Sequence, residues 1–269
     1  MNLAQKSAIA SLLAIATHLC FGQTTVAPAQ ISPASKTTTV PPTLPASPFN
    51  RTTVLLDPAH GGGDSGSRIS DSILEKDITL SLAFKLRSLL GARGFTVVMT
   101  RDSDAATQAD TPTPLSLDDR AGIANRAHPV ACLLLHATAA GNGVHIYRSE
   151  LEPIPNEVNG TSWLTAQAAW VTQSEKLQKL IGQALTRARV PLVLSRASVR
   201  PVDSLTCPAL VVELAPKGSD SSSLTDERYQ QRVAGAIAAA LVFWQNQAQP
   251  PERLAPLPTT STPKKGAQP

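Results

Sequence analysis

Four side chains that can bind a metal ion or transfer a proton lie beside predicted strands and turns. They are His60, Glu75, His136 and Glu213. Both histidines come just after short apolar runs, Glu213 lies inside another apolar run, and Glu75 begins a helical pattern after a glycine-rich turn. Two imidazoles and one carboxylate are the ligand set of a catalytic zinc site with an open fourth position. A further carboxylate can then serve as a general base.

Each of these residues also has an ordinary structural explanation. Either histidine can be a neutral structural residue with a satisfied hydrogen bond, and Glu75 suits the first turn of any helix because of the helix dipole. Glu213 is the hardest to explain in this way, because an unpaired carboxylate in an apolar strand is costly. Their joint occurrence, three at or near the ends of separate strands and Glu75 at the start of a helix, therefore indicates a site.

The segments that must position these side chains alternate between two hydrophobic periods. Short apolar runs predict strands, and apolar residues three or four apart predict helices. Ser116 and Thr225 are each predicted to cap a helix with a side-chain oxygen. The alternation indicates an α/β fold, a three-layer α/β/α sandwich around a mostly parallel, twisted sheet of about six strands, with ligands at the carboxyl ends of the strands. The predicted strands cover 53–56, 96–99, 130–135, 144–147, 197–202 and 209–214, and the predicted helices cover 75–93, 116–127, 165–189 and a segment after Thr225.

The two ends of the chain differ in composition from this central region. Of the 22 prolines, six lie between residues 28 and 48 and six between residues 250 and 269. Both ends are poor in large apolar residues and cannot bury enough surface to offset the entropy of ordering. We therefore expect a disordered linker over 23–49, a folded domain over 50–247 and a disordered tail over 248–269.

Residues 1–22 have the features of a secretory signal peptide. Lys6 supplies a positive charge, the apolar run 8–16 is too short to span a bilayer, and Gly22 is a small residue at the expected cleavage point. Lipidation of Cys20 is the alternative, although residues 17–19 match that context poorly. We expect an exported protein in the periplasm or the extracellular cell-wall space.

Charge and cysteine usage restrict the function further. The net charge of +4 is scattered and forms no basic stripe, so nucleic-acid binding has no support. No apolar segment is long enough for an integral membrane protein.

The two cysteines outside the signal peptide have two explanations. An exported location permits a disulfide between Cys132 and Cys207, but the sequence cannot place their Cα atoms, and Cys132 is also explained as a small buried residue.

The four candidate site residues lie in motifs that resemble those of the zinc-dependent N-acetylmuramoyl-L-alanine amidases of amidase type 3. Asp57-Pro58-Ala59-His60-Gly61-Gly62 is similar to the family's Asp-Pro-Gly-His-Gly-Gly, and Glu75-Lys76-Asp77 is similar to its helix-opening element. Leu134-Leu135-His136-Ala137-Thr138 is similar to Ser-Ile-His-Ala-Asn, and Val212-Glu213-Leu214-Ala215 is similar to Val-Glu-Leu-Gly. Four motifs in the family's order over about 52–247 form a specific pattern.

The resemblance implies a role for each residue. His60, Glu75 and His136 would hold Zn²⁺, and Glu213 would be the catalytic carboxylate. The substrate would be peptidoglycan, cut at the amide between N-acetylmuramic acid and L-alanine. Asp57 would orient a histidine. We expect a monomer, with an activator or wall-tethering partner that the sequence does not identify.

Three departures from the family pattern concern substrate contacts more than metal binding. Ala59 replaces a glycine before His60, Thr138 replaces the asparagine after His136, and residues 215–218 differ from the family's Gly-Phe-Leu-Ser. A weakly active or inactive peptidoglycan-binding or regulatory protein of the same fold is therefore an alternative, as is a zinc hydrolase with another amide substrate. Some members of the family block their zinc with a helical insertion in this region. The loop 149–160 is too short for such a helix, so we expect an open site. His145 is a further candidate to line the cleft.

Overall fold

The computed structural model describes residues 50–104, 114–154 and 162–247, which lie in a single compact unit. The predicted signal peptide with Cys20, the linker 23–49, the tail 248–269 and part of the loop 149–160 lie outside the described residues. Within the described part of the chain, no helix has the length and apolar character that a membrane crossing needs.

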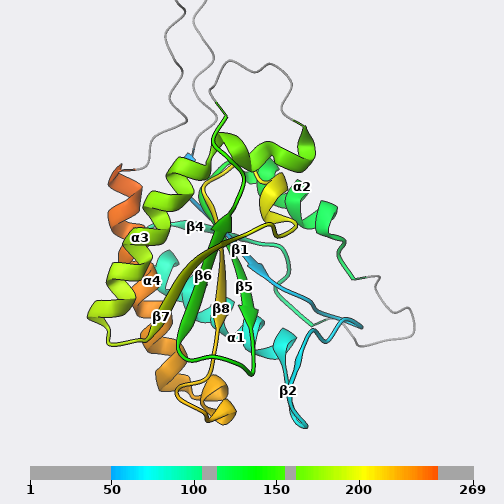
Figure 1. Cartoon of the computed structure of the whole chain (residues 1–269), viewed down its shortest axis with the longest axis vertical. Helices are drawn as coiled ribbons and strands as arrows, with labels where there is room; N and C mark the ends of the chain where they lie inside the picture. The colour runs from blue at the N-terminus through cyan, green and yellow to red at the C-terminus, as the bar shows by residue number, and fades with distance from the viewer. Residues whose placement is uncertain (1–49, 105–113, 155–161, 248–269) are drawn as a thin grey trace, which may run out of the picture. The chain divides into compact units, whose positions relative to one another are not determined.

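A six-stranded sheet with the order β4–β1–β5–β8–β6–β7 forms the middle layer (Figure 1). All neighbouring strands run parallel except β6 and β8, which are antiparallel. The predicted α/β/α sandwich with a mostly parallel sheet is therefore confirmed. The strands are β1 (Asn50–Pro58), β4 (Thr96–Met99), β5 (Pro129–Ala137), β6 (Val144–Ser149), β7 (Leu192–Ala197) and β8 (Ala209–Leu214), and β2 (Arg68–Ser70) and β3 (Ile73–Leu74) form a separate small hairpin.

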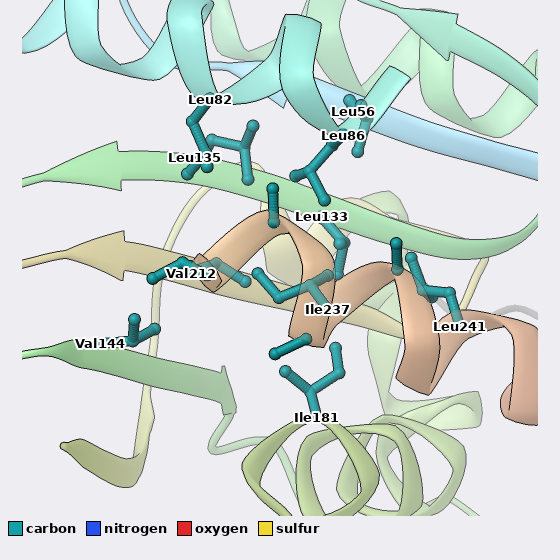
Figure 2. Packing of buried hydrophobic residues seen from close by; sticks show 14 of the residues in the cluster. Leu56, Leu82, Leu86, Leu133, Leu135, Val144, Ile181, Val212, Ile237 and Leu241 are labelled. Carbon is teal, nitrogen blue, oxygen red and sulfur yellow. The ribbon is translucent and has the colours of Figure 1, made fainter. Parts of the chain in front are cut away.

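Helices cover both faces of the sheet. α1 (Glu75–Gly91), α3 (Val171–Arg187) and α4 (Glu227–Gln247) pack on one face, and α2 (Leu117–Ala127) packs on the other. Figure 2 shows the first of these layers, in which Leu86, Ile181 and Ile237 from the three helices meet strand residues such as Leu133. These side chains are fully buried, and truncating one to alanine would cost about 2–5 kcal/mol.

β5 is apolar at successive positions because it is buried on both faces. Leu133 and Leu135 join the cluster under α1, α3 and α4, whereas Leu134 joins the cluster beside α2. Neighbouring residues of a strand point to opposite faces, so a strand between two helical layers needs an unbroken apolar run. His136, which is half-buried, interrupts this run one residue before the strand ends at the buried Ala137.

A disulfide joins Cys132 on β5 to Cys207, just before β8, with the two Cα atoms 6.2 Å apart. Both cysteines are fully buried. The pairing that the sequence permitted is thus present in the structure.

Two of the predicted elements were wrong in their limits. The predicted strand 197–202 is displaced, because β7 covers 192–197 and a short 3₁₀ turn (Val202–Ser204) follows. β7 lies at the edge of the sheet beside β6, and its short apolar run, Leu192 to Leu194, is largely exposed there. The predicted helix 165–189 begins only at Val171, after a 3₁₀ segment (Trp163–Ala169) in which Thr165 is non-helical.

The cap of the last helix was also predicted one residue too early. The Thr225 hydroxyl donates to the Ser222 carbonyl within a 3₁₀ turn (Ser221–Thr225). The Asp226 carboxylate instead accepts from the Arg228 N–H at 2.8 Å. Asp226 therefore caps α4, since it satisfies one of the amides that a helix start leaves unpaired.

Candidate metal centre

His60 lies in a tight turn directly after β1. Its φ is 63°, a left-handed value that residues with a β-carbon rarely adopt, and Gly61 follows with φ 123°. The turn closes with paired backbone hydrogen bonds between Gly61 and Asp64. The His60 ring then lies between two carboxylates, with Nδ1 at 2.9 Å from Asp64 Oδ2 and Nε2 at 3.2 Å from Glu75 Oε2.

Two arginines hold the backbone of this turn through its carbonyl oxygens. Arg120 donates to the His60 carbonyl at 2.7 Å and to the Asp57 carboxylate at 2.5 Å. Arg101 donates to the carbonyls of Pro58 and Ala59.

The family resemblance implied that Asp57 orients a histidine directly. Among the described residues, the Asp57 side chain instead binds Arg120 and the Thr100 hydroxyl. Its effect on His60 passes through the guanidinium and the backbone.

Glu75 is the first residue of α1 and is 3% exposed. Its Oε1 accepts from the Ala137 N–H at 3.2 Å and lies 2.8 Å from His136 Nδ1. Its Oε2 accepts from the Ser67 N–H at 2.9 Å. Gly66 allows this approach, since a Cβ there would lie 2.5 Å from the His60 ring.

The electrostatics of the cluster keep Glu75 charged. Burial by itself raises the pKa of Glu75, but the hydrogen bonds with His136 and His60 and from Ser67 outweigh it and hold the pKa well below its usual range. The hydrogen bond to Glu75 raises the pKa of His60, against the opposing effect of burial. A charged carboxylate between two imidazoles attracts a cation.

His60, Glu75 and His136 converge at the carboxyl ends of β1 and β5. Each offers one ligand atom, and these atoms all lie within 4.8 Å of one another. The two imidazole rings stand edge to face with their centroids 5.6 Å apart. Two nitrogens and one carboxylate oxygen match the donor chemistry of a catalytic zinc site. The structure brings together the three residues that the sequence proposed as ligands, and their metal-binding role stays a prediction.

Glu213 lies on β8 beside this cluster and is not part of it. In the sheet it is the register partner of His136 on β5 and of His145 on β6. Its Oε2 accepts from His145 Nδ1 at 2.7 Å and from the Tyr147 hydroxyl at 3.3 Å. Burial and the charge of Glu213 both raise the pKa of Tyr147. The carboxylate that lacked a partner in the sequence therefore has two.

The departures from the family pattern fit the backbone without strain. Ala59 is not among the residues with positive φ, so an alanine fits before His60 without the freedom of glycine. The Thr138 hydroxyl accepts from the Ala140 N–H and supports the turn after His136. Pro216 accepts a hydrogen bond from the Gly143 N–H, which joins the loop after β8 to the loop before β6.

Sequence reasoning missed several residues that support the site. The sequence assigned no role to Tyr147, since a tyrosine in a strand is ordinary, or to Arg120. Asp104, which accepts from Lys76 at 2.6 Å and from the Gly62 N–H, was not noted at all.

The predicted open site concerns the loop 149–160, of which residues 155–160 lie outside the described part. The described part of this loop, 149–154, holds no helix.

Comparisons with known proteins agree on one family. A family model described as N-acetylmuramoyl-L-alanine amidase matches residues 54–242. The germination-specific N-acetylmuramoyl-L-alanine amidase of Bacillus subtilis is 27% identical over 215 residues, which cover 76% of this chain and 85% of that protein. Among solved structures, the amidase Ami1 of Mycobacterium smegmatis is 22% identical with a TM-score of 0.58, over 73% of this chain and 97% of that one. The CwlD amidase of Clostridioides difficile, solved in complex with the GerS lipoprotein, is 23% identical with a TM-score of 0.56, over 73% and 99%.

Proposed function

The chain belongs to the N-acetylmuramoyl-L-alanine amidase family and is an amidase that acts on peptidoglycan, and we propose that it uses zinc to hydrolyse the amide between N-acetylmuramic acid and L-alanine. The observation that carries the zinc proposal is the convergence of His60, Glu75 and His136, whose ligand atoms lie within 4.8 Å of one another. The proposed hydrolysis needs no oxidant or reductant, because zinc would act only as a Lewis acid.

His60, Glu75 and His136 would hold the zinc ion, which when bound supplies Lewis-acid chemistry that acidifies water towards a pKa of about 7 and polarises a carbonyl. Glu213 is the general base. Its carboxylate takes a proton from the attacking water and returns it to the amine nitrogen as the C–N bond breaks. His60 and His136 come from the ends of different strands, so the sheet itself sets the spacing of the ligands.

We also propose that the chain is exported to reach this substrate. Residues 1–22 would be the signal peptide, residues 23–49 and 248–269 would be flexible connections, and residues 50–247 would form the catalytic domain. The buried disulfide supports an oxidising compartment. A partner that activates or tethers the enzyme is part of the proposal, because one relative was solved in complex with a lipoprotein.

Zinc content and product identity test this proposal together. Purified protein should bind one zinc ion and release from intact sacculi peptides that begin with L-alanine, as identified by mass. Stoichiometric zinc without released peptides would favour a peptidoglycan-binding or regulatory protein. Release of products from another amide would favour a different hydrolase of the same fold.

The role of Glu213 has a sharper test. Glu213→Gln should keep zinc and the fold, and should lower kcat by about 10²–10⁴-fold, the usual contribution of a positioned base. Zinc content is measured by metal analysis and release of stem peptides by chromatography. An active Gln variant would remove Glu213 from the mechanism.

Treatment with a chelator is the complementary experiment. The stripped wild-type enzyme should lose activity and recover it when zinc is restored. It should also unfold at a lower temperature than the zinc-loaded enzyme, because a ligand that binds only the folded state stabilises it. Unchanged activity after verified removal of the metal would contradict zinc dependence.

A further inference from the structure

Two donors from one neighbouring strand hold Glu213, and both bind the same oxygen. His145 Nδ1 lies 2.7 Å from Oε2, and the Tyr147 hydroxyl lies 3.3 Å from Oε2. Among the described residues, no hydrogen bond reaches Oε1. The carboxylate is thus fixed at one oxygen and free at the other.

The antiparallel pairing of β6 with β8 explains this arrangement. His145 is the direct register partner of Glu213, and Tyr147 lies two residues farther along β6, on the same face. Side chains at directly opposed and diagonal positions of an antiparallel pair are close enough to interact. The His145 and Tyr147 rings stand edge to face, with centroids 6.5 Å apart.

The backbone of the loop before β6 backs the His145 ring. A Cβ added at Gly141, where φ is 86°, would lie 2.3 Å from His145 Cε1 and 2.5 Å from Nε2. The imidazole is therefore confined between this glycine and Glu213, and its side chain is only 14% exposed. An ionised carboxylate can only accept hydrogen bonds, so His145 Nδ1 must carry the proton of this contact.

We propose that His145 and Tyr147 are positioning residues that anchor Oε2 of Glu213 and so select Oε1 as the atom that takes the proton. This inference rests on the proposed function. The terminal torsion of a glutamate is broad, so an unanchored carboxylate presents its oxygens in many orientations. Anchoring one oxygen in advance removes that reorganisation from the reaction.

The proton balance leaves His145 unchanged through the reaction. Oε1 of Glu213 accepts a proton from water as the oxygen–carbon bond forms, and gives it to the amine nitrogen as the carbon–nitrogen bond breaks. His145 keeps its Nδ1 proton, and Tyr147 keeps its hydroxyl proton. A side chain that donates the same hydrogen bond and has no acid–base function should therefore replace His145.

Three variants test this prediction in the zinc-loaded protein. His145→Leu removes the shorter bond and should lower kcat by about 10- to 100-fold with little change in KM, the effect of losing a hydrogen bond to a charged group. Tyr147→Phe removes the longer bond and should lower kcat by about 3- to 10-fold. His145→Asn places an amide N–H where Nδ1 stood, and should be at least about tenfold more active than His145→Leu.

His128→Asn is the matched control. His128 is exposed at the end of α2 with a left-handed φ of 45°, which asparagine tolerates well, so activity and melting temperature should not change. Zinc content and melting temperature are measured for every variant, to separate misfolding from misplacement. If His145→Asn is as inactive as His145→Leu while both hold zinc, His145 transfers protons itself and the positioning role is wrong.

A measurement that needs no activity separates this inference from the proposed function. Nitrogen-15 NMR of the histidine side chains should show His145 protonated at Nδ1, with a chemical shift that moves when Glu213 is changed to alanine. A wild-type enzyme without amidase activity that still shows this coupling would refute the function and leave the pairing standing. An Nδ1 without a proton, or one indifferent to Glu213→Ala, would overturn the inference.

Discussion

His60 occupies a backbone conformation that disfavours every residue with a β-carbon. The left-handed region costs such a residue about 1–2 kcal/mol, so the surrounding contacts must hold it there. Arg120 is the main restraint, because it binds the His60 carbonyl and the buried Asp57 carboxylate at the same time. The Arg120 and Asp57 side chains are only 6% and 4% exposed. The position of the ligand thus depends on an ion pair that makes no contact with its ring.

Replacing Arg120 with methionine should therefore destabilise the protein and weaken zinc binding. Removing one partner of a buried ion pair leaves the other charge uncompensated, which costs about 3–5 kcal/mol. The turn that carries His60 would also lose the donor to the His60 carbonyl. Urea unfolding measures the first effect, and competition with a chromogenic chelator measures the second.

The double variant Arg120→Met with Asp57→Asn serves as the control. Asparagine removes the stranded charge, so the double variant should be more stable than Arg120→Met alone. It should still bind zinc more weakly than the wild-type protein, because the donor to the His60 carbonyl is missing. A double variant no more stable than the single one would show that the ion pair is not the source of the loss.

At the scale of elements, α2 is the segment that supplies Arg120, and its start is well defined. Ser116 and Asp119 form a reciprocal capping box, in which each side chain binds the backbone N–H of the other. Arg120 follows Asp119 directly, so the cap fixes the turn from which the guanidinium reaches the site. The hydrogen bonds from the Ser116 hydroxyl and N–H lower the pKa of Asp119 below its ordinary value of 3.8.

This lowered pKa predicts how Asp119→Asn depends on pH. A carboxylate whose pKa is lower in the folded state stabilises that state above its unfolded pKa, and the effect is lost as pH falls through the folded pKa. Asp119→Asn should therefore lower the unfolding midpoint at neutral pH and approach the wild-type value in acid. Asp118→Asn is the control, since it removes the same charge from the same helical turn without breaking the box. An equal, pH-independent loss in both variants would contradict the capping role.

Elements with a strong local pattern were predicted well, and those fixed by distant contacts were not. β4, β8 and α2 match their predicted limits closely, because apolar runs or a cap define them locally. β7 was misplaced although Leu192 to Leu194 are apolar, because so short a run next to a helical pattern does not by itself distinguish a strand. The start of α3 was missed because the Gln167 side chain donates to the carbonyls of Leu205 and Cys207, 38 and 40 residues away.

The same distinction holds for the site. His60, Glu75 and His136 could be proposed from motifs, since each lies where a strand or helix ends or begins. The bond from Tyr147 to Glu213 spans 66 residues of sequence and that from Arg120 to Asp57 spans 63, and no local pattern encodes either. The apolar run around Glu213 predicted that it needs a partner, and only the strand pairing identifies that partner as His145.

For the whole molecule, the central strands β5 and β8 carry both sides of the chemistry. β5 carries His136 next to its last residue and β8 carries Glu213, and the two residues are register partners. The disulfide between Cys132 and Cys207 fastens β5 to the segment that enters β8. It lies at the end of the strand pair opposite to the site, because Cys132 pairs with Ala209 at the start of β8. The crosslink thus restrains the site through the sheet and makes no contact with it.

Removal of this disulfide should lower stability without disabling the site. It closes a loop with a sequence separation of 75, and a crosslink of this kind stabilises a fold by about 2–4 kcal/mol, mainly by restricting the unfolded chain. The double variant Cys132→Ala with Cys207→Ala should melt at a lower temperature and keep its zinc and activity well below that temperature. A reductant should lower the melting temperature of the wild-type protein and leave that of the double variant unchanged. A double variant as stable as the oxidised wild type would show that the crosslink does not contribute to stability. Loss of zinc from the double variant at low temperature would show that the site needs the disulfide to hold its ligands.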